Sequence, residues 1–265
     1  MCWAIVRCAA TACVLYFFAA IVPRSYGEVQ THTVEYTQGD TQLKGFLAFD
    51  DATAARRPGV LIVHEWWGLN DHARNKAKAL AEAGYLAFAI DMYGEGKATE
   101  HPDQAREWAG YCRHHGEVAT ARFEAAYAWL NAHELLEPGR MAAIGYCFGG
   151  NVVLSKALAG VALDAAVSFH GSLPQDAVAQ GTKVTARILV CNGGDDGLIT
   201  DEQIATFQQN VRDAGADWQF ISYGGAKHSF TNPDADKRGM AAIAYNAKAD
   251  KRSWAAMLSL FAEIW

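Results

Sequence analysis

The sequence contains no internal repeat and no low-complexity run, so nothing in it indicates a solenoid or a fibrous protein. It also has no excess of positive charge. Its 23 Lys and Arg against 29 Asp and Glu leave a formal net charge of −6, which argues against a nucleic-acid partner. With 51% hydrophobic and 20% charged residues, the composition is that of a soluble globular protein, and 265 residues are enough for one large domain.

Residues 1–27 differ from the rest of the chain, and their apolar run is too short for a membrane span. Arg7 is a short basic start, residues 8–22 are uncharged and mostly apolar, and Ser25 and Gly27 are small residues of the kind a signal peptidase reads. Because the run falls short of the roughly 20 residues that cross a bilayer, an uncleaved anchor is the weaker alternative. We expect an export signal at residues 1–27, one domain at residues 28–265, and a periplasmic or secreted protein without stable membrane insertion.

Removal of this signal would leave three cysteines, Cys112, Cys147 and Cys191. An odd number in an oxidising compartment leaves at least one thiol free, and such a thiol calls for a functional explanation. Cys147 is the natural candidate for the free thiol, while a disulfide between Cys112 and Cys191 stays open. No C-x-x-C pair is present, which argues against a thiol redox protein.

The remainder of the chain alternates short apolar strands with helical segments. A hairpin is expected at residues 34–49, and the final helix is expected at residues 240–265. Between them, strands are expected at 60–63, 85–90, 141–144, 165–169, 187–190 and 218–223, and helices at 71–83, 102–113, 118–130, 151–159 and after the Thr200–Gln203 capping box. This order predicts an α/β fold with a mostly parallel sheet, helices on both faces and an N-terminal edge hairpin.

Residues 145–150 form the centre of this predicted architecture. They read Gly-Tyr-Cys-Phe-Gly-Gly and lie between a predicted strand and a predicted helix. The pattern is that of the G-x-S-x-G nucleophile elbow with cysteine in the serine position, in which Gly145 and Gly149 leave room for a sharp turn. We expect Cys147 at a helix N-terminus, where the macrodipole favours a thiolate. A small structural cysteine between glycines is the alternative.

Candidates for an acid and a base follow the elbow in the chain order of an α/β-hydrolase triad. Asp196 and His228 each lie in a loop after a predicted strand. Asp195 competes for the acid role, but the spacing from Gly193 favours Asp196 and makes Asp195 a turn residue. An ordinary loop histidine is the alternative for His228. The remaining histidines show no metal-ligand spacing, so we predict no metal and no cofactor.

Five motifs together give the chain a resemblance to the dienelactone hydrolase family. They occur in family order over roughly residues 29–265 and read His64-Glu65-Trp66-Trp67-Gly68, Asp91-x-Tyr93-Gly94, Gly145-Tyr146-Cys147-Phe148-Gly149-Gly150, Gly193-x-x-Asp196 and Ala226-x-His228-Ser229-Phe230. The resemblance implies an α/β-hydrolase fold, hydrolysis of a small ester or lactone without a cofactor, and a monomer. A non-catalytic binding protein and a thiol redox protein on the same fold are the alternatives.

The resemblance also implies a role for each site residue. Cys147 attacks the carbonyl carbon and forms an acyl-enzyme, His228 moves the protons, and Asp196 orients the imidazole. The oxyanion is expected to accept hydrogen bonds from the backbone amides of Trp66 and Phe148. These assignments make the loops at the carboxyl ends of the strands the expected active site.

Glu65 is the distinctive residue of this family pattern. The resemblance implies that its carboxylate meets the resting Cys147 thiol and takes the thiol proton when substrate binds. A carboxylate beside a thiol disfavours the thiolate by like-charge repulsion, which would limit oxidation of the resting protein. A solvated carboxylate at the start of a loop is the plain alternative.

The chain departs from the family at Asn232. Family members that act on dienelactone carry an arginine there that helps to bind the substrate carboxylate, and an uncharged amide cannot replace it. Arg106 is a weak candidate for a second family arginine. We therefore expect a less anionic ester or lactone as substrate, in a pocket whose walls include Trp66, Trp67, Tyr93 and Phe230, with core packing as the alternative for these aromatic residues.

Overall fold

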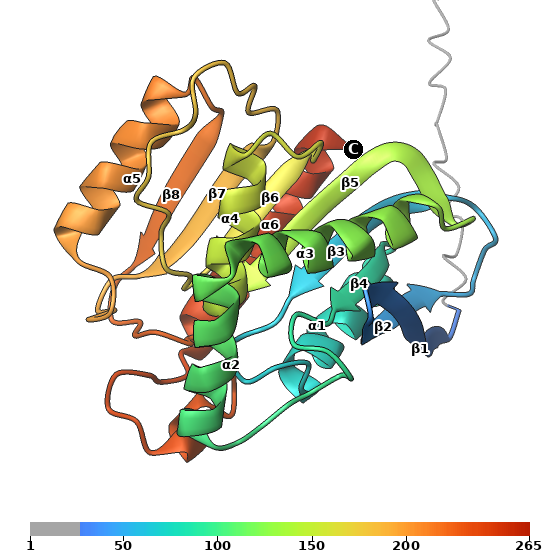
Figure 1. Cartoon of the computed structure of the whole chain (residues 1–265), viewed down its shortest axis with the longest axis horizontal. Helices are drawn as coiled ribbons and strands as arrows, with labels where there is room; N and C mark the ends of the chain where they lie inside the picture. Colours follow the sequence, from blue (N-terminus) through green and yellow to red (C-terminus); the bar gives the residue numbers. More distant parts are fainter. Residues whose placement is uncertain (1–26) are drawn as a thin grey trace, which may run out of the picture.

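The computed structural model describes residues 27–265, which form one eight-stranded sheet flanked by helices (Figure 1). Apart from Gly27, the expected export signal lies outside the described residues, so it stays a prediction. The strands are β1 (Val29–Gln38), β2 (Thr41–Asp50), β3 (Arg57–Val63), β4 (Leu86–Ile90), β5 (Leu136–Tyr146), β6 (Ala165–Phe169), β7 (Arg187–Gly193) and β8 (Trp218–Tyr223). The helices are α1 (Asp71–Glu82), α2 (Pro102–His114), α3 (Gly116–Asn131), α4 (Phe148–Leu158), α5 (Asp201–Asp213), the 3₁₀ helix η1 (Ala235–Arg238) and α6 (Ala247–Ile264).

The strands follow the order β1-β2-β4-β3-β5-β6-β7-β8 across the sheet. β1 and β2 pair in antiparallel fashion at one edge, β2 is antiparallel to β4, and every other neighbouring pair is parallel. The predicted mostly parallel sheet with an N-terminal edge hairpin is therefore confirmed. Within residues 27–265, no helix is long and apolar enough to cross a membrane.

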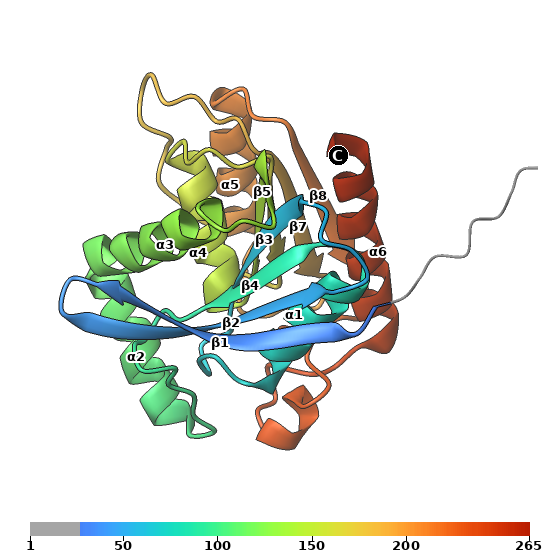
Figure 2. The same ribbon diagram turned by 90° about the vertical axis from the view of Figure 1, so that its right-hand side faces the viewer.

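Helices cover both faces of the sheet, so the central strands are apolar on both sides (Figure 2). In β3, Leu61 and Val63 face the cluster under α2 to α5, whereas Val60 and Ile62 face the cluster under α1 and α6. All four side chains are fully buried. The continuous apolar run that predicts this strand is thus explained by the alternation of side chains between two cores.

The last helix begins later than the sequence predicts. The prediction of a helix from residue 240 is wrong, because α6 begins at Ala247, with Asn246 as its N-cap. The residues before it pair with the loop that carries His228. Ile243 forms a bridge with His228, and the amide of Ala244 donates to the His228 carbonyl at 3.1 Å. A segment that is apolar and alanine-rich like a helix therefore serves to hold the histidine loop.

The predicted requirement for glycine at the elbow is confirmed by the space around it. A Cβ atom on Gly145 would lie 2.1 Å from the Gly149 carbonyl oxygen. One on Gly149 would lie 2.2 Å from the Val63 carbonyl oxygen. Backbone atoms occupy both positions and cannot rotate away as a side chain could, so α4 lies directly against the end of β3.

We expect Gly149→Ala to lower the free energy of unfolding by about 3 kcal/mol, because the added methyl group overlaps the β3 backbone. Urea unfolding followed by circular dichroism would measure the change. Gly110→Ala is the matched control, since Gly110 lies in α2 with no atom within 4 Å of its added Cβ. That substitution should stabilise the helix by up to about 1 kcal/mol. Equal effects of the two substitutions would contradict the steric explanation.

Candidate active site

The candidate catalytic residues come together at the carboxyl edge of the sheet. Glu65 follows β3, Cys147 follows β5, Asp196 follows β7 and His228 follows β8. The carboxyl ends of neighbouring parallel strands meet at one edge, so these four loops converge, as the topology predicts. His170 follows β6 at the same edge, and its ring centroid lies 5.4 Å from that of His228.

Cys147 occupies a strained turn between β5 and α4. Its φ of 53° and ψ of −112° are unusual for a residue with a side chain and are the kind of strain that functional sites retain. The Cys147 amide donates to the Phe169 carbonyl at 3.0 Å, and the Cys147 carbonyl accepts from the Gly150 amide. The side chain is partly exposed at the first turn of α4, where the helix dipole favours a negative sulfur.

Asp196 and His228 form a buried pair. The Nδ1 atom of His228 lies 2.8 Å from Oδ2 of Asp196, and both residues are at most 5% exposed. The amide of Leu198 donates to the other carboxylate oxygen of Asp196. Asp195 does not take this place, because its side chain is exposed and accepts a hydrogen bond from the Gly225 amide. The carboxylate next to the histidine is therefore that of Asp196.

The charge of Cys147 acts on the His228 imidazole. Burial lowers the pKa of His228, but the negative charge of Cys147 and the hydrogen bond to Asp196 raise it to about 10. The imidazolium is thus stable at neutral pH while the sulfur is ionised. A protonated imidazole beside a thiolate can hold the thiolate in place and can later protonate a leaving group.

Two backbone amides, on the loops that carry Glu65 and Cys147, have no hydrogen-bond partner among the described residues. Within residues 27–265, neither the Trp66 amide nor the Phe148 amide donates a hydrogen bond. Phe148 is the first residue of α4, so its amide belongs to the group of helix N-terminal donors that lack an intrahelical acceptor. Amides of this kind can stabilise an oxyanion in a neighbouring substrate.

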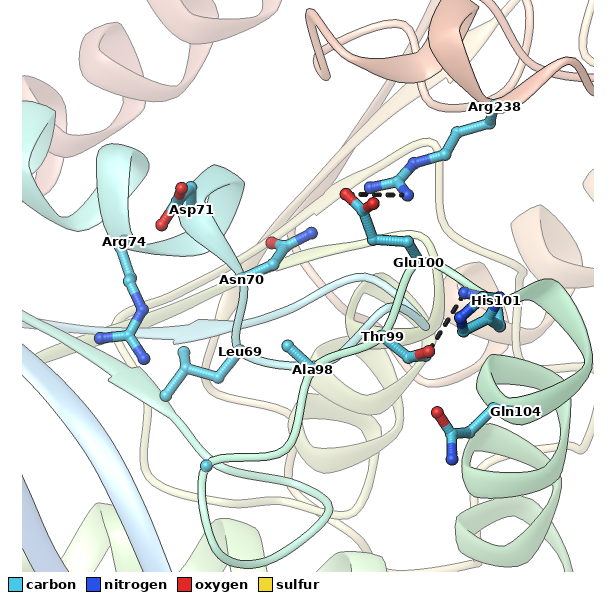
Figure 3. A pocket seen from close by; sticks show the side chains of 11 residues that line it. Leu69, Asn70, Asp71, Arg74, Ala98, Thr99, Glu100, His101, Gln104 and Arg238 are labelled. Atoms are coloured by element: carbon cyan, nitrogen blue, oxygen red, sulfur yellow. Dashed lines mark hydrogen bonds and ion pairs between the residues drawn. The ribbon is translucent and has the colours of Figure 1, made fainter.

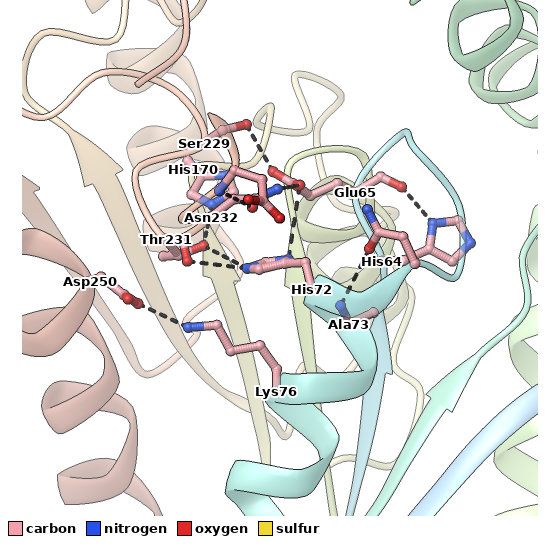
Figure 4. Close-up of polar contacts among 12 residues, drawn as sticks. His64, Glu65, His72, Ala73, Lys76, His170, Ser229, Thr231, Asn232 and Asp250 are labelled. Atoms are coloured by element: carbon pink, nitrogen blue, oxygen red, sulfur yellow. Dashed lines mark hydrogen bonds and ion pairs between the residues drawn. The ribbon is translucent and has the colours of Figure 1, made fainter. Parts of the chain in front are cut away.

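The Glu65 carboxylate is fully buried and held by two donors (Figure 4). Ser229 Oγ donates to Oε1 at 2.8 Å, and Asn232 Nδ2 donates to Oε2 at 2.6 Å. No hydrogen bond joins Glu65 to Cys147 within the part of the chain that the structure describes. The thiol-contacting role of Glu65 therefore stays a prediction. The solvated alternative is wrong, because the side chain is fully buried.

The two donors to Glu65 are residues that sequence reasoning did not assign to it. Asn232 is only 2% exposed and binds Glu65 rather than lining an open cavity. Its position four residues after His228, close to the motif that contains Ser229, was the available signal. Arg106 forms an ion pair with Asp103 on the surface of α2, where 63% of its side chain is exposed, so the structure gives it no place in the site.

The predicted aromatic walls divide between the site and the core. Tyr93 packs against the Phe148 ring at a centroid distance of 5.7 Å, and its hydroxyl donates to the Trp66 carbonyl at 3.1 Å. Trp66 is partly exposed on this loop. By contrast, Trp67 and Phe230 are at most 1% exposed. Their rings pack under Arg238 and against His170, respectively, so they are core residues here and substrate contact by them stays a prediction.

All three cysteines of residues 27–265 are free thiols. Cys112 donates to the Met92 carbonyl, and Cys191 accepts a hydrogen bond from the Tyr223 hydroxyl. The disulfide that stayed open between Cys112 and Cys191 is therefore not formed. Burial raises the pKa of Cys112 to about 11 and that of Cys191 to about 12, so neither is readily ionised at neutral pH.

A separate cavity of about 650 Å³ lies beside the start of α1 (Figure 3). Asn70, Arg74 and Glu100 line it, and Glu100 pairs with Arg238 at 3.5 Å across it. Cys147 and His228 do not line this cavity. Among the described residues, no group of three or more His, Cys, Asp or Glu side chains is arranged to hold a metal ion.

The fold and the placement of these residues are those of an α/β-hydrolase. The profile of the dienelactone hydrolase family matches residues 43–265, and the chain belongs to this family of ester and lactone hydrolases. A putative carboxymethylenebutenolidase of Escherichia coli K12 is 30% identical over 216 residues, which cover 77% of this chain and 76% of that protein. A protein of Salmonella typhimurium with the same description is 28% identical and covers 86% of this chain and 84% of its own length.

Solved structures agree with this assignment. A dienelactone hydrolase-like promiscuous phosphotriesterase from metagenomic libraries has a TM-score of 0.85 and 36% identity, covering 90% of this chain and 99% of its own. A putative dienelactone hydrolase from Klebsiella pneumoniae has a TM-score of 0.75 at 22% identity over 89% of this chain and 99% of its own, which supports the shared fold.

Proposed function

We propose that this protein hydrolyses a small ester or lactone through a Cys147–His228–Asp196 triad and an acyl-enzyme. The observation that carries the proposal is the strained Cys147 turn at the start of α4, next to a histidine whose Nδ1 lies 2.8 Å from Asp196. Burial lowers the pKa of His228, but Cys147 and Asp196 together raise it to about 10, so the imidazole can act as a proton donor at neutral pH. Neither Cys112 nor Cys191 has comparable surroundings.

In the proposed first step, the carboxylate of Glu65 takes the Cys147 proton, and the resulting thiolate attacks the carbonyl carbon while the carbonyl π electrons move onto the oxygen. The free amides of Trp66 and Phe148 would donate to this oxyanion. When the C–O bond of the ester breaks, the His228 imidazolium gives its proton to the leaving oxygen. A water molecule then attacks the acyl-enzyme and gives a proton to His228, the C–S bond breaks to release the acid, and the thiolate takes its proton back from Glu65. Asp196 holds Nδ1 of the imidazole throughout, so that Nε2 faces the reacting atoms.

The proposed substrate is a small ester or lactone without a carboxylate close to the Glu65 side of the site. The side-chain amide of Asn232 donates a hydrogen bond to Glu65, and neither Asn232 nor Ser229 carries a positive charge. An anionic group placed beside Asn232 and Ser229 would meet an amide and a hydroxyl in place of the bidentate arginine that suits a carboxylate. The two relatives described as putative carboxymethylenebutenolidases support the ester and lactone class, because a butenolide is an unsaturated lactone.

We expect the purified protein to hydrolyse p-nitrophenyl acetate and to carry an acetyl group on Cys147 when the reaction is quenched early with acid. Mass spectrometry of the digested protein would locate the adduct. Glu65→Gln should lower the rate, because an amide cannot accept the thiol proton. Hydrolysis without an adduct on Cys147, or no hydrolysis under reducing conditions, would contradict the proposal and favour a binding or redox protein.

A further inference from the structure

His72, in the first turn of α1, lies next to the Glu65 carboxylate (Figure 4). Its side chain is 5% exposed, and its Nδ1 atom lies 3.9 Å from Oε2 of Glu65. Nδ1 is buried and has no hydrogen-bond partner within the described residues. The mechanism described so far gives this histidine no role.

The other ring nitrogen defines where the His72 protons are. Nε2 lies 3.2 Å from the carbonyl oxygen of Thr231, and a carbonyl oxygen only accepts hydrogen bonds. The Thr231 hydroxyl is further from Nε2, at 3.5 Å, so the carbonyl is the nearer partner and favours a proton on Nε2. A neutral His72 would then present the lone pair of Nδ1 to the carboxylate of Glu65, which is an unfavourable arrangement of two electron-rich atoms in a buried site.

One additional proton removes this conflict. Placed on Nδ1, it gives an imidazolium beside a carboxylate, and placed on Oε2, it gives a carboxylic acid beside a neutral imidazole. Either way the pair has no net charge, which is the state that burial favours for two groups without access to water. We propose that Glu65 and His72 share this proton, and that His72 is thereby a positioning residue that sets the protonation of Glu65.

The consequence for catalysis rests on the proposed function, in which Glu65 takes the Cys147 proton. In that step the S–H bond breaks, the proton joins a Glu65 oxygen, and the electron pair stays on the sulfur. The other proton stays on Nδ1 of His72. Before and after the step the three groups have the same total charge, because the proton only moves from the sulfur to Glu65. The positive ring keeps Glu65 ionised down to a lower pH than a neutral neighbour would.

Other groups around His72 modify this balance. Lys76 lies one turn further along α1 and disfavours a second positive charge, but its ammonium is paired with Asp250 of α6 at 2.9 Å. The Tyr146 ring packs edge-on against the His72 imidazole at a centroid distance of 4.8 Å. Thr231 Oγ1 contacts Nε2 of both His72 and His170 and so links the two rings. Burial, which is the largest effect, keeps the pKa of His72 below its usual value, although Glu65 and Asp250 act to raise it. The titratable or charged groups that act on His72, or on which it acts, are Glu65, Lys76, Tyr146, His170, Asp234 and Asp250.

Nitrogen NMR of the ¹⁵N-histidine-labelled full chain tests the shared proton without any activity. The His72 resonances are assigned by their loss in His72→Gln. We expect Nδ1 of His72 to show partial protonation at neutral pH, and we expect Glu65→Gln to shift it to an unprotonated nitrogen. A plain neutral ring with an unprotonated Nδ1 in both proteins would overturn the proposal. Because the spectrum needs no substrate, it decides the point even if the protein hydrolyses no ester.

The pH profile of kcat/KM tests the consequence. His72→Gln keeps a donor near the position of Nε2 but cannot be protonated, so the acid limb should move to higher pH by about one unit. His72→Asn, which keeps a donor near Nδ1, should move it less. His32→Gln, on the exposed surface of β1, is the matched control and should leave the limb in place. An unmoved acid limb in a folded His72→Gln protein would overturn the role of His72 in setting the protonation of Glu65.

Discussion

Replacement of Cys147 by alanine should reduce the kcat for ester hydrolysis by about 10⁴-fold or more, to a rate near the detection limit. The sulfur is the atom that forms the acyl bond, and no neighbouring side chain can take its place. Stopped-time assays with p-nitrophenyl acetate at high enzyme concentration would measure the residual rate. Substrate binding should change little, because alanine keeps the elbow backbone and removes only the thiol.

The control for this prediction is Cys191→Ala. Cys191 is also a free thiol, but it is fully buried at the end of β7 with its pKa raised to about 12. This substitution should cost stability through the lost packing while leaving kcat within about twofold of the parent. Hydrolysis that survives Cys147→Ala but is lost in Cys191→Ala would show that the elbow thiol is not the nucleophile.

The position of the elbow could be predicted because local sequence signals agree there. The apolar run of β5, the two glycines around Cys147 and the helical pattern that follows act on neighbouring residues, so they can be recognised without knowledge of the rest of the fold. The same holds for the capping box at Thr200 and Gln203, which the structure contains with both hydrogen bonds. The edge hairpin could be predicted from the alternation of apolar and polar residues alone.

The surroundings of Glu65 could not be predicted in this way. Its hydrogen bonds to Ser229 and Asn232 join residues 164 and 167 positions apart, and no local pattern encodes such contacts. The family resemblance compares Asn232 with an arginine that binds substrate. In the structure, the side-chain amide of Asn232 binds the Glu65 carboxylate instead. The sequence also could not separate Tyr93 at the site from Phe230 in the core, since an aromatic residue serves equally well in both places.

The segment before α6 is a second place where tertiary contacts could not be predicted from the sequence. Its residues have the composition of a helix, and a helix from residue 240 is the natural prediction. In the fold, however, Ala244 and Asn246 bind the backbone of the loop that carries His228 and Phe230. These contacts fix the loop and hence the imidazole, which is why tertiary hydrogen bonds take precedence over local propensity here.

Asp196→Asn should reduce kcat by about 10³-fold to 10⁴-fold with a folded structure close to that of the parent. The carboxylate accepts the proton of Nδ1, which leaves Nε2 to exchange protons with the sulfur and the substrate. An asparagine amide that donates to Nδ1 would reverse the tautomer and place the proton on Nε2 permanently. Because Asp196 helps to raise the pKa of His228, the alkaline limb of kcat/KM should also move to lower pH.

Asp195→Asn is the control that separates this effect from a general loss of charge in the loop. Asp195 is the adjacent residue, but its exposed side chain binds only the Gly225 amide, which an asparagine oxygen can also accept. We expect its kcat and alkaline limb to match the parent, as measured with the same ester between pH 6 and pH 10. Similar losses in both variants would mean that the loop, rather than the Asp196–His228 contact, controls the rate. A loss confined to Asp196→Asn, together with the shifted limb, would assign the orienting role to Asp196 alone.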